Sequence, residues 1–179
     1  MNAARRTLLR AGLTVTAVAA LGAGVWASLQ FGKRQPRVDD ASPLFALTLP
    51  GVDGTQTALA QWRGRRLVVN FWATWCAPCV EEMPDLQVLA TELRQSDVTV
   101  LGLAIDDPAK VRAFAARLAI DYPLLVIGAP GLDLLRSFGH AEASLPFTAV
   151  IDREGRIRQR IRGRVEPAAL RRELASANA

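Results

Sequence analysis

Histidine and cysteine are scarce in this chain. Its 179 residues include one His, His140, and two Cys, Cys76 and Cys79. A zinc site needs two ligands more than one cysteine pair supplies, and one His with no further Cys does not provide them. A structural disulfide between residues three positions apart closes too small a loop to stabilise a fold by much. The lack of further metal ligands and the small size of the loop both favour a redox role for the cysteine pair.

Acidic residues are absent from residues 1–37, which carry six basic ones. Of the 22 basic residues this leaves 16 for the rest of the chain, against all 17 acidic residues, so the net charge of +5 belongs to the N-terminal segment. A nucleic-acid-binding domain carries a basic excess on its folded surface. We therefore expect no nucleic-acid partner.

A long uncharged segment follows the first arginines. Residues 11–32 contain no charged side chain, and Arg5, Arg6 and Arg10 precede them. At about 1.5 Å per residue, a helix of this length crosses a hydrocarbon core of roughly 30 Å. We predict a signal anchor or transmembrane helix over 1–32, a linker over 33–42 and a folded domain over 43–179.

Cleavage of this segment is the alternative, which would leave a free periplasmic form. Val25-Trp26-Ala27 resembles a cleavage site, and Arg5-Arg6 resembles a twin-arginine export signal. Basic residues flank the segment at both ends, so the positive-inside rule does not decide its orientation. A cysteine pair with no other thiol suits a compartment where disulfides form. We expect the domain to be exported.

The cysteine pair lies where a predicted strand ends and a predicted helix begins. Residues 67–72 are mostly apolar and predict a buried strand, and the apolar spacing over 80–93 predicts a helix. Residues at i and i+3 lie roughly 5–6 Å apart on one helix face, within disulfide reach. The unpaired N–H groups and the dipole of the helix start favour a thiolate at Cys76. Cys79, one turn further, is expected to be the more buried, resolving thiol, and Pro78 fits the first helical turn.

Strands and helices alternate along the chain. The predicted strands cover 44–49, 67–72, 98–105, 124–127, 147–151 and 156–164, and the predicted helices cover 80–93, 109–118, 132–138 and 167–175. This order predicts an α/β fold with a central mixed sheet and helices on both faces.

Arginines occupy alternate positions of the last predicted strand, at Arg156, Arg158, Arg160, Arg162 and Arg164. Alternate residues of a strand share one face, so Ile157, Ile161 and Val165 are expected on the other. We interpret the arginines as a solvated edge whose like charges discourage edge-to-edge association. Docking onto an acidic partner or anionic lipid headgroups is the alternative.

Two segments resemble known signatures. Residues 69–84, which contain Trp75-Cys76-Ala77-Pro78-Cys79, resemble the active-site segment of the thioredoxin superfamily, and more closely that of its membrane-anchored TlpA/ResA type. Residues 145–157, which begin Leu145-Pro146-Phe147-Thr148, are similar to the second signature of that type. The resemblance covers roughly residues 42–176 and implies a thioredoxin-like three-layer sandwich.

The resemblance assigns the chemistry to three residues. Cys76 matches the attacking thiol, Cys79 matches the resolving thiol, and Glu82 matches an acidic residue implicated in their proton traffic. Asn70 stands where thioredoxin has a buried aspartate. An amide cannot take up a proton at neutral pH, which makes Glu82 the more attractive base; a purely electrostatic role at the helix start is the alternative.

The resemblance also implies a substrate-binding surface. Pro146 matches a cis-proline that faces the cysteines and exposes the backbone of Leu145 for strand-like pairing with a substrate peptide. Trp75 and Pro78, which flank Cys76, complete the expected substrate-binding residues.

The implied function is that of an extracytoplasmic thiol:disulfide oxidoreductase that reduces protein disulfides with its cysteine pair, without cofactor or metal. The resemblance places it in the bacterial inner membrane with the catalytic domain facing the periplasm, and implies a thiol transporter of the DsbD/CcdA type as electron source. The implied substrates are apocytochrome c cysteines, in cytochrome c maturation, or the cysteines of copper-site assembly. A Gly-Val motif of some cytochrome-maturation members is absent, since residues 142–145 read Glu-Ala-Ser-Leu, which weakens the cytochrome interpretation.

Two other functions on this fold remain alternatives. A copper-binding metallochaperone needs Cys-x-x-x-Cys and a distal His, whereas this chain has Cys-x-x-Cys and a lone His140, which we interpret as a surface residue. A thiol peroxidase needs Pro-x-x-x-Thr-x-x-Cys, and residues 71–74, Phe-Trp-Ala-Thr, lack the proline.

Overall fold

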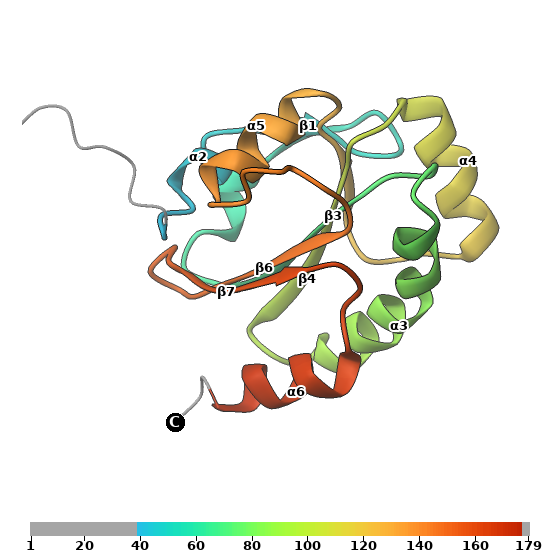
Figure 1. Ribbon diagram of the computed structural model, residues 1–179. Helices are drawn as coiled ribbons and strands as arrows, with labels where there is room; N and C mark the ends of the chain where they lie inside the picture. The colour runs from blue at the N-terminus through green and yellow to red at the C-terminus, as the bar shows by residue number, and fades with distance from the viewer. Residues whose placement is uncertain (1–38, 177–179) are drawn as a thin grey trace, which may run out of the picture. The chain divides into compact units, whose positions relative to one another are not determined.

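A five-stranded sheet forms the centre of the folded domain (Figure 1). The computed structural model describes residues 39–176. The strands lie in the order β5-β4-β3-β6-β7; β3, β4 and β5 are parallel, and β6 is antiparallel to both β3 and β7. Their bounds are Arg66–Trp72 for β3, Val98–Ala104 for β4, Leu124–Val126 for β5, Phe147–Ile151 for β6 and Ile157–Arg162 for β7. The predicted mixed sheet is confirmed.

Strand β3 is buried along its whole length. Leu67, Val69 and Phe71 face one hydrophobic core, and Val68 and Trp72 face the other. A strand covered on both faces carries a nearly continuous apolar sequence, which is why its location could be predicted from sequence. The cysteine pair follows at the C-terminal end of this central strand.

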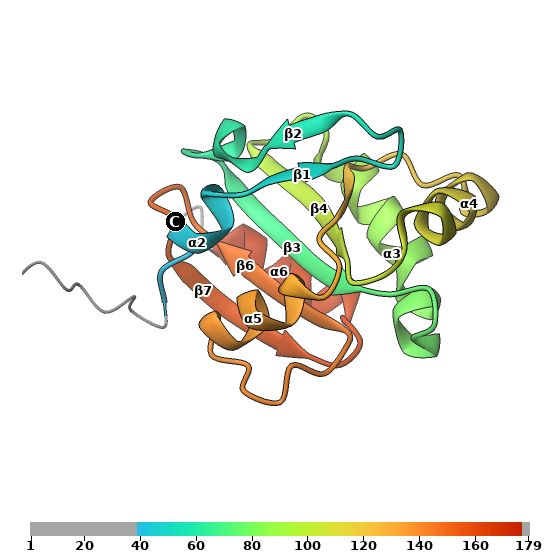
Figure 2. The same ribbon diagram turned by 90° about the horizontal axis from the view of Figure 1, so that it is seen from above.

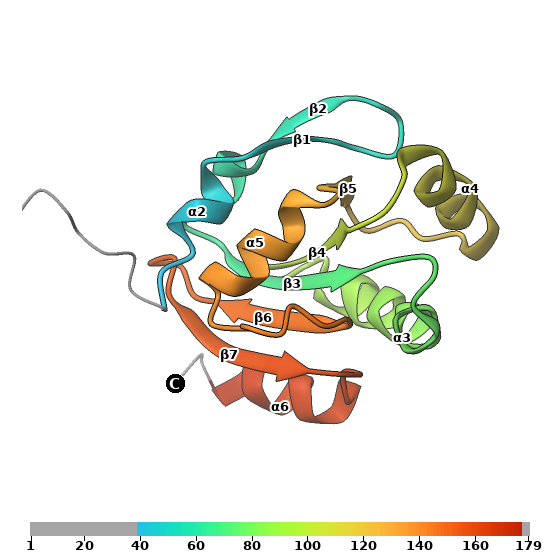
Figure 3. The ribbon, with the colours of Figure 1, turned by 45° about the horizontal axis from the view of Figure 1, so that its top comes forward.

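Helices cover one face of the sheet with the active-site helix among them (Figures 1 and 3). These are α3 (Ala77–Leu93), α4 (Pro108–Leu118) and α6 (Pro167–Ser176). Buried side chains of all three join one core cluster with the side chains that β3 and β4 present to that face.

The opposite face is covered by shorter elements. They are α2 (Ser42–Phe45), the 3-10 helix η1 (Leu59–Trp62) and α5 (Pro130–Ser137), with a hairpin of β1 (Thr48–Pro50) and β2 (Gln56–Ala58) beside them (Figure 2). Two helical layers thus enclose the sheet, and the predicted thioredoxin-like three-layer sandwich is confirmed.

The segment before residue 50 differs from its prediction. One strand is expected over 44–49, but the structure has the short helix α2 followed by a strand of three residues. Pro43 lies in the first turn of α2, where its missing N–H costs nothing, and Leu44 and Phe45 are buried. A short apolar run fits a strand and a buried helical turn equally well, and this is why the prediction was wrong.

The described part of the chain is integrated into the fold from its first residue. The N–H of Ile157 donates to the carbonyl of Asp39 at 2.8 Å, and Asp40 forms a bridge with Arg156. These contacts precede residue 43, where the predicted domain begins. The predicted signal anchor over 1–32 lies outside the described residues. Within residues 39–176 no helix combines the length and the apolar character needed to cross a membrane.

A bulge in β7 overturns the predicted alternation of its side chains. Ile151 pairs with Ile157, but the neighbouring Val150 pairs with Gln159, so β7 contains one extra residue at this point. The extra residue reverses the alternation that follows it. Ile157 therefore packs into the core beneath α5, while Ile161 packs against the core beneath α3. The prediction that both share a face was wrong.

The arginines of this region contact folded partners on both faces. Arg160 donates to the carbonyl of Phe138 at 2.6 Å, and Arg162 to that of Gly139 at 3.4 Å. These carbonyls follow α5, where a helix lacks internal donors for its last carbonyl groups. On the other face Arg164 pairs with two carboxylates of α3, those of Glu81 and Asp85.

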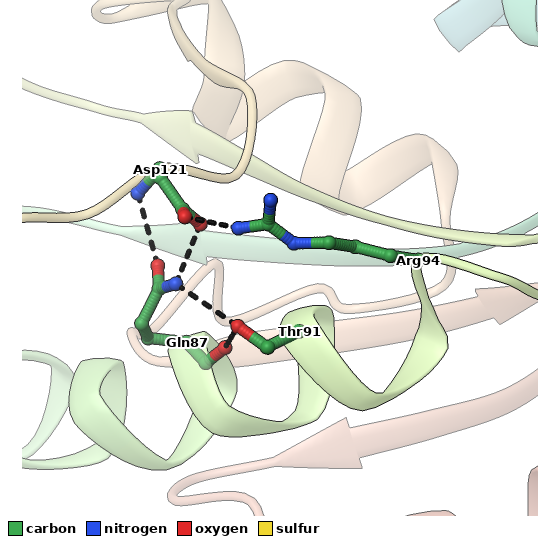
Figure 4. Close-up of polar contacts among 4 residues, drawn as sticks. All are labelled: Gln87, Thr91, Arg94 and Asp121. Carbon is green, nitrogen blue, oxygen red and sulfur yellow. Dashed lines mark hydrogen bonds and ion pairs between the residues drawn. The ribbon is translucent and has the colours of Figure 1, made fainter.

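An exposed polar cluster ties α3 to the segment before β5 (Figure 4). The N–H of Asp121 donates to Gln87 Oε1 at 2.9 Å, and Gln87 Nε2 donates back to Asp121 Oδ1 at 2.5 Å. Arg94 pairs with the other carboxylate oxygen of Asp121, and Gln87 Nε2 also reaches Thr91 Oγ1. Hydrogen bonds from Gln87 and Arg94 hold the pKa of Asp121 below its ordinary value.

Candidate active site

The two cysteines form a disulfide at the start of α3. Their Cα atoms are 5.3 Å apart, in the range expected for residues at i and i+3. A turn leads from β3 into the helix, because the N–H of Cys76 donates to the carbonyl of Ala73 at 3.2 Å. Cys76 is the N-cap residue of α3 and has an extended backbone, with φ −95° and ψ 99°. The unpaired N–H groups and the dipole of the first helical turn favour a thiolate at this position once the disulfide is reduced.

The cysteines differ in exposure in the predicted order. Cys76 is 6% exposed and Cys79 is 0% exposed. Trp75, directly before Cys76, is 67% exposed, and Pro78 in the first turn of α3 is exposed as well. Cys76 is thus the only one of the two cysteines with any exposed surface, and it follows an exposed indole ring in the chain.

A carboxylate from the neighbouring strand holds the turn before Cys76. Asp106 follows β4 and accepts hydrogen bonds from Thr74, from its N–H at 2.8 Å and from its hydroxyl at 2.5 Å. Burial acts to raise the pKa of Asp106, but the hydrogen bonds from Thr74 and from the N–H of Asp107 outweigh it and keep that pKa below its ordinary value. We did not predict this contact. The signal was present, because Asp106 directly follows a predicted strand, and adjacent parallel strands end at one edge of the sheet.

Glu82 is fully buried one turn after Cys79. Its Oε1 accepts a hydrogen bond from Asn70 Nδ2 at 2.7 Å, and its Oε2 accepts one from the N–H of Val165 at 2.8 Å. Asn70 Nδ2 also donates to Thr148 Oγ1 at 3.0 Å. Burial raises the pKa of Glu82, while the hydrogen bonds from Val165 and Asn70 oppose that shift. A carboxylate with a raised pKa, three positions from a buried thiol on the same helix, can receive a proton from it.

Two further buried polar atoms lie in the same core. The hydroxyl of Tyr122 and the indole Nε1 of Trp72 have no hydrogen-bond partner among the described residues. Both side chains border Gly102, where an added Cβ would lie 3.2 Å from Trp72 Nε1 and 3.3 Å from the Tyr122 ring. Burial, assisted by the charge of Glu82, raises the pKa of Tyr122. Tyr122 therefore stays protonated, and sequence reasoning did not identify it.

The segment Leu145–Pro146 lies between the end of α5 and β6. Its peptide bond is cis, as the resemblance implies. The carbonyl of Pro146 accepts a hydrogen bond from Gly163 at 2.9 Å, which ties the segment to the end of β7. The N–H and C=O groups of Leu145 have no hydrogen-bond partner within residues 39–176. The side chain of Leu145 packs against both cores, the second of which contains Cys76 and Cys79.

The prediction that His140 lies on the surface was wrong. The residue is 0% exposed, and its ring stacks on Phe147 with centroids 4.9 Å apart. Its Nε2 lies 3.0 Å from the backbone N of Ser144. Within residues 39–176 no three His, Cys, Asp or Glu side chains are grouped so that they could hold a metal ion. A copper site built from His140 and the cysteines therefore has no support in this part of the chain.

Comparison with known proteins agrees with this geometry. The Redoxin family matches residues 37–178. The thiol-disulfide oxidoreductase ResA of Geobacillus thermodenitrificans is 28% identical over 177 residues, which are 98% of each chain.

Solved structures show the same fold. A thiol:disulfide interchange protein of the thioredoxin family from Chlorobium tepidum superposes with a TM-score of 0.64 and 28% identity, over 74% of this chain and 93% of that one. The exposed lipoprotein thioredoxin of Streptococcus pneumoniae superposes with a TM-score of 0.60 and 29% identity, over 73% of this chain and 98% of that one. The start of α3 holds a cysteine pair of which Cys79 is fully buried and Cys76 is 6% exposed, and the family match covers most of the chain. The chain therefore belongs to the Redoxin family and is a ResA-like thiol:disulfide oxidoreductase of the thioredoxin superfamily.

Proposed function

We propose that this oxidoreductase reduces disulfides of exported proteins, with its catalytic domain on the outer side of the bacterial inner membrane. The observation that carries the proposal is the unequal setting of the two thiols. Cys76 caps α3 and is 6% exposed, and Cys79 is fully buried three positions before Glu82. This arrangement suits one thiol that attacks a protein substrate and a second that releases it.

The reaction is a two-step thiol–disulfide exchange. The Cys76 thiolate attacks one sulfur of the substrate disulfide, so that a Cys76–substrate bond forms and the other substrate sulfur leaves as a thiolate. Cys79 then attacks the sulfur of Cys76 and releases the second substrate thiolate. Two electrons pass from the cysteine pair to the substrate, and the Cys76–Cys79 disulfide remains.

Glu82 serves the second step. The Cys79 thiol has to lose its proton before it can attack, and burial disfavours the free thiolate. Glu82 accepts that proton, since burial raises its pKa toward that of a thiol. The protonated carboxyl group then needs an acceptor, and Asn70 Oδ1, which has no partner among the described residues, can provide one after the amide turns over.

Leu145 receives the substrate chain. A polypeptide next to Cys76 can pair its backbone with the unpaired N–H and C=O groups of Leu145, as an added strand pairs with a sheet edge. Trp75, which is largely exposed, adds an apolar contact beside Cys76, and Pro78 borders the same entrance.

The N-terminal sequence supports the membrane location. Arg5, Arg6 and Arg10 precede 22 uncharged residues, as in a signal anchor, and cleavage would release a periplasmic form. A reductase in an oxidising compartment needs electrons from the cytoplasm, so a membrane thiol transporter of the DsbD/CcdA type is the proposed donor. The proposed substrates are apocytochrome c cysteines or the cysteines of copper-site assembly.

Two cysteine variants test the proposal. Cys79→Ser, expressed in cell envelopes, should accumulate mixed disulfides between Cys76 and exported proteins, and the trapped proteins identify the substrate class. Cys76→Ser should trap none and should lose insulin-disulfide reduction. Full insulin reduction by Cys76→Ser would exclude the mechanism, and trapped partners that are all cytoplasmic would exclude the location. Turnover of hydrogen peroxide would instead support the thiol peroxidase alternative.

A further inference from the structure

The loop between α5 and β6 is held by the only histidine of the chain. The N–H of His140 donates to the carbonyl of Leu135 in α5 at 3.0 Å, and its ring stacks on Phe147 at an interplanar angle of 8°. The imidazole thus lies between the end of α5 and the start of β6. The residues that follow it lead directly to Leu145.

The imidazole of His140 contacts both backbone groups of Ser144. The N–H and the carbonyl oxygen of Ser144 each lie 3.0 Å from Nε2. An unprotonated Nε2 accepts from that N–H, and a protonated Nε2 donates to that carbonyl, so the ring has a backbone partner in Ser144 in either tautomer. The Ser144 hydroxyl also lies 3.0 Å from Nε2. Nδ1 is buried, has no hydrogen-bond partner among the described residues, and lies 3.8 Å from the exposed carboxylate of Glu142.

The residues before and after Leu145 are both held by hydrogen bonds. On one side Ser144 is bonded to His140, and on the other the carbonyl of Pro146 is bonded to Gly163. Leu145 lies between the two anchors and has no backbone hydrogen bond of its own within residues 39–176. Its N–H and C=O groups are therefore oriented by its neighbours and remain available.

Stacking alone does not explain an imidazole here. A Phe side chain would keep the apolar contact with Phe147 and would bury no unpaired ring nitrogen, which carries a desolvation cost. What a Phe would lose is the hydrogen bond between Nε2 and the backbone of Ser144. The bond to Ser144 is thus the contribution that is specific to His140.

We propose that His140 is a positioning residue, which orients Leu145 through Ser144 so that a substrate strand can pair with it. The inference rests on the proposed reduction of protein disulfides. Loss of the bond lets the Ser144–Leu145 peptide rotate, and a substrate chain then has to order it on binding. The resulting fall in kcat/KM should be larger for substrates that pair through their backbone than for small disulfides that contact Cys76 alone.

The first test is whether the ring of His140 has one fixed tautomer. The full-length chain contains one His, so ¹⁵N-labelled histidine gives a single pair of ring nitrogen signals without assignment ambiguity. We expect the signals of one tautomer, because Nε2 is bonded either to the N–H or to the carbonyl of Ser144. Averaged signals of two exchanging tautomers would overturn the inference, whether or not insulin is a substrate.

The second test compares two substrates in matched variants of the full-length chain. His140→Phe keeps the stacking and removes the hydrogen bond to Ser144, whereas His140→Gln places an amide group, which can accept or donate, near the former Nε2. Loss of one hydrogen bond corresponds to about a three- to tenfold effect. For His140→Phe, kcat/KM for insulin should fall by about that factor relative to kcat/KM for the small disulfide DTNB, mostly through KM. His140→Gln should recover most of the loss.

Different results would contradict the positioning role of His140 and the proposed reduction of protein disulfides. An equal fall for insulin and DTNB, or no fall for either, in a folded His140→Phe variant would overturn the inference. A wild-type protein that reduces DTNB but never a polypeptide disulfide would overturn the proposed function, and the ring nitrogen signals would still show whether His140 is fixed on Ser144. Glu142→Gln, which alters an exposed neighbour, is the control and should match the wild type.

Discussion

Replacing Glu82 with Gln removes the proposed proton acceptor while keeping the size of the side chain. The amide oxygen of the new side chain can still accept from the N–H of Val165. Its amide nitrogen can donate to Asn70 Oδ1, which has no partner among the described residues, once the Asn70 amide turns over. We therefore expect Glu82→Gln to fold and to keep the hydrogen-bond network of the site.

The kinetic effect should fall on one step only. General acid–base catalysis contributes about 10²- to 10⁴-fold to a rate. Glu82 is fully buried three positions after the buried Cys79 on α3, so release of the mixed disulfide should slow by about 100-fold at neutral pH. The first attack on the substrate should change by less than about twofold. Rapid quenching with a peptide disulfide measures both steps, since the mixed disulfide accumulates in between.

The pH dependence of stability provides a second readout. Burial raises the pKa of Glu82 above its ordinary value of 4.5. A group whose pKa is higher in the folded state stabilises the protein below its unfolded pKa, and that stability is lost as pH rises through the folded pKa. The glutamine does not titrate. The free energy of unfolding of Glu82→Gln should therefore rise relative to wild type from about pH 4.5 upward, and the difference should level off above the folded pKa.

Two results would refute this reasoning. One is release of the mixed disulfide at the wild-type rate in Glu82→Gln. The other is a difference in unfolding free energy that stays constant across the whole pH range. Glu81→Gln is the matched control, because Glu81 is an exposed neighbour on the same helix and should leave both steps unaltered.

Three further substitutions test packing around the site, each by urea unfolding. Tyr122→Phe removes a buried hydroxyl without a partner in the described part of the chain and should raise the free energy of unfolding by about 1 kcal/mol; a loss would show that the hydroxyl is bonded. Thr74→Val removes the hydroxyl bonded to Asp106 and should lower the free energy of unfolding by about 1 kcal/mol, and Thr74→Ser should restore most of that loss. A free energy of unfolding that is the same in Thr74→Val and in the wild type would contradict the contact. Asp121→Asn weakens the exposed cluster of Figure 4 and should lower the free energy of unfolding slightly in low salt. This loss should disappear in high salt, which screens exposed charges. A loss that does not depend on salt would point to another cause.

The central strand and its helix could be predicted because their signals are local. Residues 67–72 are apolar except for Asn70, and the strand is buried on both faces. The helix after the cysteines shows its apolar spacing over about two turns, at Leu86, Leu89, Ala90 and Leu93. The segment 44–49 is too short for such a signal, and its proline at the start of α2 decided the outcome.

Contacts between distant segments were the part that could not be predicted from residue patterns. The prediction of which β7 side chains share a face was wrong because a bulge after Ile157 reverses the alternation. The regular spacing of the arginines gives no sign of this bulge. His140 was interpreted as exposed because burial of a lone His depends on Phe147 and Ser144 closing around it. The resemblance identified Glu82, but its bond to Val165 depends on the path of the chain after β7.

The most direct test of the account is the alkylation of the reduced protein as a function of pH, followed by mass spectrometry of each cysteine. The account predicts that Cys76 reacts first and that its rate reports a thiol pKa below the ordinary value of about 8.5. Cys79 should stay protected until the protein unfolds. Equal modification of both cysteines, or a Cys76 pKa at or above the ordinary value, would contradict the claim that the start of α3 activates Cys76 and shields Cys79.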